Sequence, residues 1–320
     1  MAKRKIVITH DLQDEQLQRI KEIAIDWDII SSRDENIWLN HIKDAEIIVG
    51  WKKEIAEHAI QPNSKLRWFQ SWSAGINKLP LESFKELNII LTGASGVHAY
   101  PVSETIFALM LALTRKIDTY VKNQREKKWH HSGLSLEMHE KTVGIIGVGA
   151  IGKETAKIAK AFGMRVLGVR HSGKREEYVD EMFKLGELNS IIPLCDYIVI
   201  TLPLTEETYH LFGAKQFQLM KKSAFFINIG RGNIVVEQEL IKALQQKTIT
   251  GAGLDVFEKE PLSEDNPLWD LENVIITPHS SGSTEHYAKR VIEDIFIPNL
   301  QSYLARETLP INLIDYEKGY

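Results

Sequence analysis

Cysteine is almost absent from this sequence: Cys195 is the only one among 320 residues. A single thiol cannot form an internal disulfide, so we expect a fold held together by packing and a reducing, cytoplasmic setting. Cys195 lies just before the apolar run "DYIVITLP". The expected role of this residue is therefore buried packing rather than nucleophilic chemistry.

The sequence also lacks a marked excess of one charge and any long apolar run. Its 39 Lys and Arg nearly balance 43 Asp and Glu, which leaves a net charge of −4. This balance gives no electrostatic reason to expect nucleic acid or an anionic membrane as a partner. The N-terminus, "MAKRKIVITHDLQDE", turns polar after about five apolar-rich residues. That run is too short for a signal peptide core or a membrane span.

The residues that are present have the composition of an ordinary folded protein, with 43% apolar and 26% charged residues. Short apolar runs alternate with amphipathic stretches, which predicts an α/β fold with parallel sheets covered on both faces. The predicted strands are "KIVIT", "AEIIVG", "LRWFQSW" and "NIILTGA", then "TVGIIGV", "MRVLGVR", "DYIVITLP", "AFFINIG", "TGAGLDV" and "NVIITPH".

A long helix is predicted to begin near Pro101, with an apolar stripe that runs from Val102 to Val121. It separates two β/α blocks, so we expect two domains. Residues 100–285 form the predicted second domain, and residues 1–99 with 286–320 form a discontinuous first domain. The last helix, from "STEHYAKRVIEDIF", is expected to bend at Pro298. "KREEYVDEMFK" is expected to be a solvated helical face.

The stretch "TVGIIGVGAIGKETAKIAKAFGMRVLGVRHSG" carries the clearest motif. Gly147, Gly149 and Gly152 form G-x-G-x-x-G directly after a strand and at the start of a helix. The first glycine permits a tight turn, the second lets a pyrophosphate approach the backbone, and the third lets the helix pack on the strand. The helix N-terminus then offers free N–H groups to the phosphates. This context predicts a dinucleotide site.

Arg170 stands at the end of the second strand of this block, where an acidic residue usually accepts hydrogen bonds from the adenosine ribose. An arginine at this position is suited to a 2′-phosphate, with Ser172, Lys174 and Arg175 nearby. We therefore expect NADP to be preferred. The alternative is NAD, with Arg170 solvated or stacked on the adenine.

Three further polar residues follow strands of the second block: Arg231 after "FFINIG", Glu260 after "LDVFEKE" and His279 after "VIITP". Ligands of open α/β sheets bind beyond the carboxyl ends of the strands. An arginine fork binds a carboxylate and polarises an adjacent carbonyl. A histidine transfers a proton near neutral pH, and a carboxylate on its other ring nitrogen fixes its tautomer. This set predicts reduction of a keto acid, with Arg231, Glu260 and His279 as the catalytic residues.

The motifs "VGIIGVGAIGKE", "LPLTEETYHLF", "INIGRG", "GLDVFEKEPL" and "NVIITPHSSGST" occur in this order. Together they resemble the D-isomer-specific 2-hydroxyacid dehydrogenase family, and "QSWSAGINKLPL" and "GVHAYPVSETIFALMLALTR" extend the resemblance more loosely. The resemblance implies a Rossmann-type doubly wound domain, a discontinuous flavodoxin-like substrate domain, a D product and a homodimer built around the long helix after Pro101. It also implies the same Arg, Glu and His triad.

The resemblance places the substrate carboxylate on backbone N–H groups of the "WSAG" loop, and Asp255 against the nicotinamide carboxamide. The residues expected to bind substrate are Trp51, Ser73, Ala74, Gly75, Tyr100 and Arg231. Those expected to bind the cofactor are Gly147, Gly149, Ala150, Ile151, Gly152, Arg170, His171, Ser172, Leu202, Pro203, Ile229, Gly230, Asp255, Ser281 and Gly282. Trp51, Trp72 and Tyr100 indicate either an aromatic-lined pocket or core packing.

Several alternatives stay open at this stage. The main prediction is a 2-ketoacid reductase acting on glyoxylate, hydroxypyruvate or a larger 2-ketoacid. A phosphoglycerate dehydrogenase is disfavoured because no regulatory domain is evident and few basic residues accompany Lys52 and Lys53. Glu260 with His279 also argues against a relative that oxidises formate or phosphite. A dinucleotide-sensing corepressor is the non-enzymatic alternative. No metal is expected, because His130 and His131 lack further ligands at suitable spacing.

Overall fold

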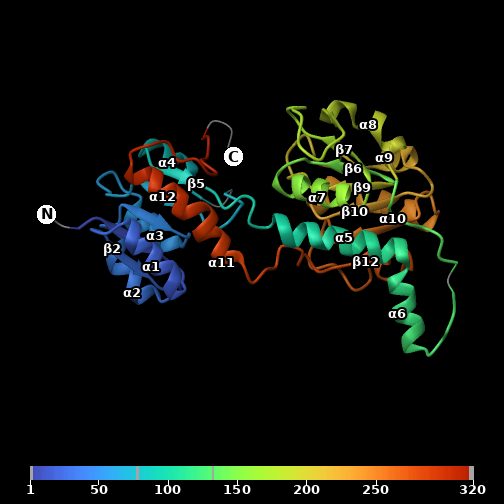
Figure 1. Cartoon of the computed structure of the whole chain (residues 1–320), viewed down its shortest axis with the longest axis horizontal. Helices are drawn as coiled ribbons and strands as arrows, with labels where there is room; N and C mark the ends of the chain where they lie inside the picture. The colour runs from blue at the N-terminus through green and yellow to red at the C-terminus, as the bar shows by residue number, and fades with distance from the viewer. Residues whose placement is uncertain (1–2, 77–78, 132, 317–320) are drawn as a thin grey trace. The chain divides into compact units, whose positions relative to one another are not determined.

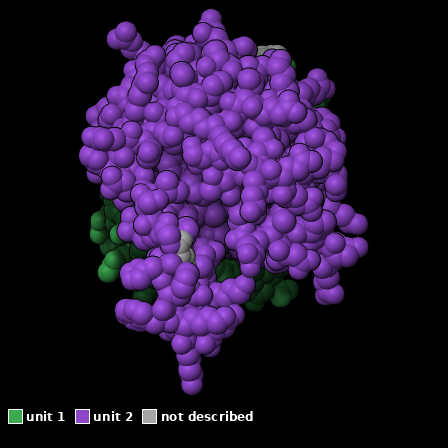
Figure 2. All heavy atoms as spheres, turned by 90° about the vertical axis from the view of Figure 1, so that its right-hand side faces the viewer, with its two compact units in different colours: residues 1–97, 284–320 green, residues 98–283 purple. Residues whose placement is uncertain are grey.

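A computed structural model describes residues 3–76, 79–131 and 133–316 of the chain. The chain divides into two compact units, one formed by Met1–Val97 with Thr284–Tyr320 and the other by His98–Ser283 (Figures 1 and 2). The predicted domain boundaries, 99/100 and 285/286, each lie two residues beyond these divisions. Residues 317–320 of the predicted first domain lie outside the described residues.

The discontinuous unit is built on a five-stranded sheet with the order β2-β1-β3-β4-β5. All of its pairings are parallel, and this order is the flavodoxin-like one that the family resemblance implied. The strands are β1 (Lys5–Ile8), β2 (Asp28–Ser31), β3 (Ile47–Val49), β4 (Trp68–Gln70) and β5 (Ile90–Thr92). The helices are α1 (Asp14–Ile23), α2 (Glu35–Ile42), α3 (Lys53–Ala59), α4 (Leu81–Glu86), α11 (Tyr287–Lys289) and α12 (Ile297–Leu304).

An apolar cluster covers each face of this sheet. Helices α2, α3 and α4 close one face around the buried Trp38, Ile55 and Phe84. Helices α1 and α12 close the other face around Ile20 and Leu300 (Figure 1). The segment after α12 then returns to the sheet, where an isolated antiparallel bridge joins Leu313 to Thr92 of β5. Both ends of the chain therefore belong to one layered unit, and burial of apolar side chains on both faces stabilises it.

The second unit contains a seven-stranded sheet with the order β12-β11-β10-β9-β6-β7-β8. Its pairings are again parallel. Counted from β6, the order is 3-2-1-4-5-6-7, which extends the Rossmann arrangement by one strand. The α/β prediction is confirmed for both units. The strands are β6 (Thr142–Ile146), β7 (Arg165–Val169), β8 (Glu181–Phe183), β9 (Tyr197–Ile200), β10 (Phe225–Asn228), β11 (Gly251–Leu254) and β12 (Val274–Ile276).

Helices cover both faces of this sheet as well. Helices α5 and α7 pack on one face and α8, α9 and α10 on the other (Figure 1). Cys195 lies in the second of these layers and is fully buried, and its burial raises the pKa of the thiol to about 12. The bounds are α5 (Ala99–Arg115), α6 (Ile117–Arg125), α7 (Ala150–Ala161), α8 (Leu188–Ile191), α9 (Ala214–Leu219) and α10 (Glu237–Gln245), with 3₁₀ turns at Leu185–Glu187, Ile192–Leu194, Gly232–Ile234 and Pro267–Asp270.

Two predictions about local structure were wrong. The long helix after Pro101 is divided at Lys116, whose left-handed backbone (φ +53°) ends α5 and starts α6. The stretch "KREEYVDEMFK" is not helical: Val179 and Met182 pack against the core, and β8 pairs with the edge of the sheet. A three-residue edge strand between charged neighbours leaves too few apolar positions to show a period of two.

The last helix also differs from the prediction in detail. A π-helical segment, Arg290–Phe296, connects α11 to α12, and Pro298 occupies the first turn of α12. Proline has no N–H to donate, so the wider π turn accommodates it at this junction. Among the described residues, no helix is both long and apolar enough to cross a bilayer.

Truncation of a ring at the centre of the second sheet should destabilise this unit. Phe226 of β10 is fully buried, and its ring centroid lies 5.3 Å from those of both Phe212 and Phe217. We expect Phe226→Ala to lower the free energy of unfolding by about 3–5 kcal/mol, measured by urea titration. Phe162→Ala is the matched control and should lose less, because Phe162 is 37% exposed. Equal losses of unfolding free energy in the two variants would contradict the buried position of Phe226.

Candidate active site

The glycine turn leaves open space where a pyrophosphate would need it. Gly147 has a φ of +117°, and a Cβ there would lie 2.8 Å from the backbone N of Leu202. A Cβ on Gly152 would lie 2.5 Å from the carbonyl oxygen of Gly147. Gly149 is different, because a Cβ on it would have no neighbouring atom within 4 Å. The turn is therefore closely packed at Gly147 and Gly152 and open at Gly149, at the start of α7. A dinucleotide pyrophosphate fits this open position.

The other residues expected to bind the cofactor lie at neighbouring strand ends or at the start of α7. A Cβ on Gly230, after β10, would lie 2.8 Å from the carbonyl oxygen of Leu202, after β9. These two strand ends thus pack closely together beside the turn. Ser281, after β12, is buried. The contacts of this set with a cofactor, together with those of Ala150, Ile151, Pro203, Ile229 and Gly282, stay predictions.

Arg170 extends from the end of β7 over the glycine turn. Its Nε donates to Ser172 Oγ at 3.0 Å, and one terminal nitrogen donates to the Val148 carbonyl at 3.3 Å. The same terminal nitrogen contacts Glu176 Oε2 at 3.0 Å, while His171 is exposed. Nothing in the sequence pattern singles out Glu176, which lies six positions after Arg170 in a charged run. The structure makes this carboxylate the partner of the cation expected to distinguish the two cofactors.

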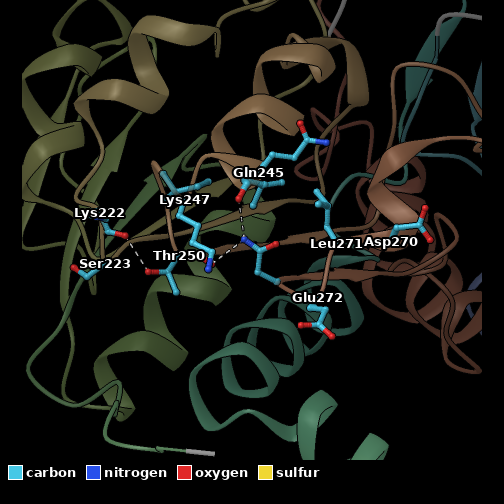
Figure 3. Close-up of a pocket in the computed structure, with 11 residues that line it drawn as sticks. Lys222, Ser223, Gln245, Lys247, Thr250, Asp270, Leu271 and Glu272 are labelled. Atoms are coloured by element: carbon cyan, nitrogen blue, oxygen red, sulfur yellow. Dashed lines mark hydrogen bonds between the residues drawn. The ribbon is translucent and has the colours of Figure 1, made fainter.

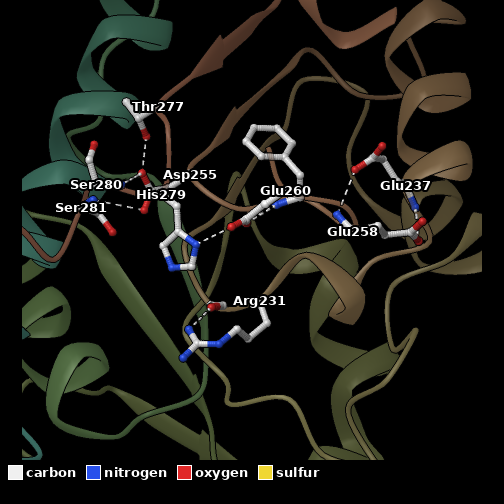
Figure 4. Close-up of polar contacts among 11 residues, drawn as sticks. Arg231, Glu237, Asp255, Glu258, Glu260, Thr277, His279, Ser280 and Ser281 are labelled. Carbon is white, nitrogen blue, oxygen red and sulfur yellow. Dashed lines mark hydrogen bonds and ion pairs between the residues drawn. The ribbon is translucent and has the colours of Figure 1, made fainter. Parts of the chain in front are cut away.

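His279 and Glu260 are in hydrogen-bond contact, the pairing that the sequence predicted. His279 Nδ1 and Glu260 Oε2 are 2.7 Å apart, and Glu260 Oε1 accepts a hydrogen bond of 3.0 Å from the Phe257 N–H (Figure 4). The carboxylate is thereby anchored to its own loop and holds the Nδ1 edge of the ring. His279 is exposed, so Nε2 remains accessible to a substrate. The imidazole is positioned for proton transfer.

A buried carboxylate fixes the turn that carries this histidine. Asp255, after β11, is fully buried. Its carboxylate accepts from Thr277 Oγ1 at 2.6 Å, from the Ser280 N–H at 3.0 Å and from the Ser281 N–H at 3.2 Å (Figure 4). Its carbonyl accepts from the His279 N–H at 2.9 Å. These bonds hold His279 at a φ of +50°, a conformation that neighbours must stabilise. Contact of Asp255 with a nicotinamide carboxamide stays a prediction.

Arg231 lies in the same group, with its guanidinium on the side of the His279 ring (Figure 4). Its side chain is exposed, and one terminal nitrogen donates to the Gly230 carbonyl at 2.7 Å. The next residue, Gly232, packs so closely that a Cβ there would lie 1.9 Å from the Phe257 carbonyl carbon. The loop after β10 and the loop that bears Glu260 are thus pressed together, and the three residues predicted to be catalytic lie at one sheet edge.

The expected carboxylate-binding loop of the other unit is only partly free to bind an anion. The Ser73 N–H already donates to Ser71 Oγ at 3.1 Å, and Ser71 Oγ donates to the Ser73 carbonyl at 2.9 Å. The Ser73 N–H therefore has a partner within its own loop, and its binding of the substrate carboxylate stays a prediction. Ala74 and Gly75 are exposed, and a Cβ on Gly75 would meet nothing within 4 Å. Ala74 and Gly75 are therefore better candidates than Ser73 for binding the substrate carboxylate.

The aromatic residues expected near the substrate have mixed surroundings. Trp51 is half-buried and meets Phe69 and Phe84 edge to face, at centroid distances of 5.8 and 6.4 Å. Trp72 stacks on His10 at 3.9 Å, and burial lowers the pKa of His10 to about 4. Both tryptophans therefore contribute to packing within their unit. Tyr100 of α5 is 49% exposed, and its contact with substrate stays a prediction.

A surface cavity of about 780 Å³ lies away from these residues (Figure 3). Lys222, Thr250 and Asn273 line it and precede β10, β11 and β12, so it lies at the amino edge of the sheet. The group formed by Arg231, Glu260 and His279, which is predicted to be catalytic, lies beyond the carboxyl ends of the same strands. In the ranges that the structure describes, no three His, Cys, Asp or Glu side chains gather to hold a metal, and His130 and His131 are exposed.

Two alanine substitutions should have different effects, one at the open Gly149 of the glycine turn and one at the closely packed Gly232. We expect Gly149→Ala to fold normally but to bind NADPH at least about tenfold more weakly, because its Cβ would occupy the approach of the pyrophosphate. Gly232→Ala should lower the melting temperature, because its Cβ meets backbone that must move. Thermal unfolding and fluorescence titration measure the two effects. Unchanged NADPH binding by Gly149→Ala would exclude the turn as the pyrophosphate site.

Comparisons with known proteins agree with this geometry. The family model for the D-isomer specific 2-hydroxyacid dehydrogenase NAD binding domain matches residues 107–281. The chain is 32% identical over 324 residues to a glyoxylate reductase of Korarchaeum cryptofilum, which covers 98% of this chain and 97% of that protein. It is 34% identical over 292 residues to a D-3-phosphoglycerate dehydrogenase of Methanocaldococcus jannaschii, which covers 89% of this chain and 55% of that protein.

A solved structure matches nearly the full length of this chain. An NADPH-dependent glyoxylate/hydroxypyruvate reductase from Sinorhizobium meliloti, in complex with NADP and sulfate, is 25% identical with a TM-score of 0.78. The match covers 99% of this chain and 100% of that one. With a family model that matches more than half of its length and a relative that it matches from end to end, this chain belongs to the D-isomer specific 2-hydroxyacid dehydrogenase family.

Proposed function

We propose that this protein is an NAD(P)-dependent 2-hydroxyacid dehydrogenase that works as a reductase of small 2-ketoacids, such as glyoxylate or hydroxypyruvate. The observation that carries the proposal is the contact of 2.7 Å between His279 and Glu260. This pair lies at the same sheet edge as Arg231 and the open glycine turn from Gly147 to Gly152. Relatives named glyoxylate reductase and glyoxylate/hydroxypyruvate reductase support this substrate class.

The substrate is oriented by its carboxylate and its ketone oxygen. Arg231 offers a planar fork of donors, which binds a carboxylate with two hydrogen bonds and polarises the adjacent carbonyl. We propose that the backbone N–H groups of Ala74 and Gly75, two exposed residues, bind the same carboxylate. Together these groups fix which carbon of the substrate reacts.

NAD(P)H, when bound, would supply a hydride to C2 of the ketoacid. The turn from Gly147 to Gly152 would hold its pyrophosphate, and Arg170 would hold its adenosine ribose end. His279 gives a proton from Nε2 to the alkoxide that develops on the former ketone oxygen. Glu260 stabilises the imidazolium and keeps Nδ1 protonated, and Asp255 holds the turn on which the ring is carried. The family resemblance implies a D product.

We further propose that NADP is the preferred cofactor, on the strength of Arg170 and Ser172 at the end of β7. Support comes from the reductase of Sinorhizobium meliloti, whose structure contains NADP. A 2′-phosphate adds negative charge and acceptor oxygens that suit a guanidinium. NAD offers a ribose hydroxyl at that position and gains less from the cation.

A homodimer and a cytoplasmic location complete the proposal. Helix α5 is largely buried in its own unit, whereas Ile117, Val121 and Trp129, on and after α6, are 49%, 42% and 98% exposed. Helix α6 projects away from the helices that cover the sheet (Figure 1). We propose that these three exposed apolar side chains, on α6 and in the segment after it, form the dimer contact. The single, buried Cys195 is consistent with a reducing compartment.

The test of this function is a panel of 2-ketoacids assayed with both cofactors. Glyoxylate, hydroxypyruvate, 3-phosphohydroxypyruvate and a branched 2-ketoacid cover the candidates, and formate tests the one-carbon alternative. We expect turnover of at least one unphosphorylated 2-ketoacid with NADPH. NADPH binding without turnover of any member would indicate a sensing protein instead. A marked preference for the phosphorylated compound would indicate a phosphoglycerate dehydrogenase.

Glu260 should act through His279, and a double-mutant cycle tests this. We expect His279→Ala to lower kcat for ketoacid reduction roughly 10²–10⁴-fold. Glu260→Gln should lower it about 10- to 100-fold, the loss of a charged hydrogen bond of about 1.5–3 kcal/mol. The double variant should be no slower than His279→Ala alone. Losses that multiply would show that Glu260 acts independently of the histidine.

Arg170 should decide the choice of cofactor. Wild type is expected to prefer NADPH over NADH in kcat/KM by roughly one to two orders of magnitude, as expected of a charged hydrogen bond. Arg170→Asp should reverse the order, because it removes the fork and adds repulsion. Steady-state kinetics at one fixed ionic strength measure both proteins. If Arg170→Asp leaves the cofactor preference unchanged, Arg170 is only a solvated or adenine-stacking side chain.

A further inference from the structure

Arg170 shares its counter-ion with a second cation. Glu176 Oε2 lies 3.0 Å from Arg170 and 2.8 Å from Lys153 Nζ, in the first turns of α7. One carboxylate oxygen thus bridges a cation after β7 and a cation on the helix that follows the glycine turn. The hydrogen bond from Lys153 holds the pKa of the Glu176 carboxyl below its usual value, so Glu176 is an anion at neutral pH.

Glu176 is turned inward from an otherwise exposed loop. Its side chain is 18% exposed, while Lys174, Arg175, Glu177 and Tyr178 on either side are exposed. The loop is anchored at both ends. The Gly173 N–H donates to the Arg170 carbonyl at 3.0 Å, and the Asp180 carboxylate accepts from the Val166 N–H at 2.7 Å. Glu176 can therefore leave its cations by a movement of this surface segment alone.

The charges of the cluster do not balance. Lys153 and Arg170 carry two positive charges, and Glu176 supplies one negative charge. A 2′-phosphate carries up to two negative charges and three free oxygens, so it would balance both cations. An end-on fork from both terminal nitrogens of Arg170 would use the nitrogen that Glu176 now contacts. A carboxylate left beside the phosphate would repel it.

We propose that Glu176 is an internal competitor of the cofactor 2′-phosphate, and that Lys153 is a second cation of the phosphate site. This inference rests on the proposed NADP-linked function and names the residues that set the strength of the preference. NADP exchanges its phosphate for the Glu176 carboxylate on Lys153 and Arg170. Because NAD has no 2′-phosphate, the contacts of Glu176 with Lys153 and Arg170 stay in place when NAD binds. Glu176 therefore reduces the difference in affinity between NADP and NAD that Lys153 and Arg170 create.

Binding of each cofactor to the full-length protein tests the exchange without turnover. Dissociation constants for NADPH and NADH are measured by fluorescence titration at one ionic strength. Glu176→Gln should bind NADPH about 3- to 10-fold more tightly, because two partly exposed ion pairs no longer have to be broken. Its NADH affinity should change by less than about twofold. Lys153→Met should weaken NADPH binding and leave NADH binding nearly unchanged.

Each variant has a matched control in the neighbouring sequence. Glu177→Gln removes the same charge from the adjacent exposed residue and should leave both affinities near wild type. Lys157→Met removes a cation from the same helix, one that pairs with Glu154 at 3.4 Å, and should spare the preference. Adenosine 2′-monophosphate and adenosine 5′-monophosphate serve as fragment probes. Only the 2′-monophosphate should bind more tightly to Glu176→Gln.

Two results would overturn this inference. Unchanged NADPH affinity in Glu176→Gln would show that the carboxylate does not occupy the phosphate position. Selectively weakened NADH binding would instead assign Glu176 to the ribose hydroxyl of NAD. In either case normal ketoacid turnover by the wild type would leave the proposed function intact. A wild type that binds neither cofactor would contradict both.

Discussion

The parallel direction of all seven strands is the constraint on which the proposed chemistry of the second unit depends. Strands that run in one direction end at one edge. The glycine turn follows β6, Arg170 follows β7, Arg231 follows β10, and Asp255 and His279 follow β11 and β12. Residues separated by more than a hundred positions in the sequence thus share one edge of the sheet. A dinucleotide and a small acid bound there would meet the same set of groups.

The groups at this edge are held by hydrogen bonds rather than by their own stiffness. Asp255 is buried, and its two oxygens accept three hydrogen bonds from the turn that carries His279. Glu260 is tied back to Phe257 and pairs with the ring. A buried carboxylate without these partners would be strongly unfavourable. The hydrogen bonds that Asp255 requires therefore fix the backbone of the turn, and the turn fixes the position of His279.

Those parts of the fold that depend on continuous apolar runs could be predicted from the sequence. The strands around the glycine turn and the strand-end positions of Arg231, Glu260 and His279 are such cases. The break at Lys116 and the edge strand β8 could not, because each depends on packing contacts that leave no periodic pattern. The Ser71–Ser73 hydrogen bond and the Glu176 bridge also escaped prediction. Both depend on loop conformation, which the spacing of residues does not determine.

The central claim is that the edge bearing His279 and Arg231 reduces a 2-ketoacid by hydride transfer to C2. The most direct measurement is the fate of deuterium when the protein is given glyoxylate and NADPH that carries deuterium at both hydrogen positions of nicotinamide C4. NMR of the product should show glycolate with one deuterium on C2, formed by the wild type and at a greatly reduced rate by His279→Ala. Glycolate without deuterium at C2, or no hydroxyacid from any 2-ketoacid tested, would contradict the account.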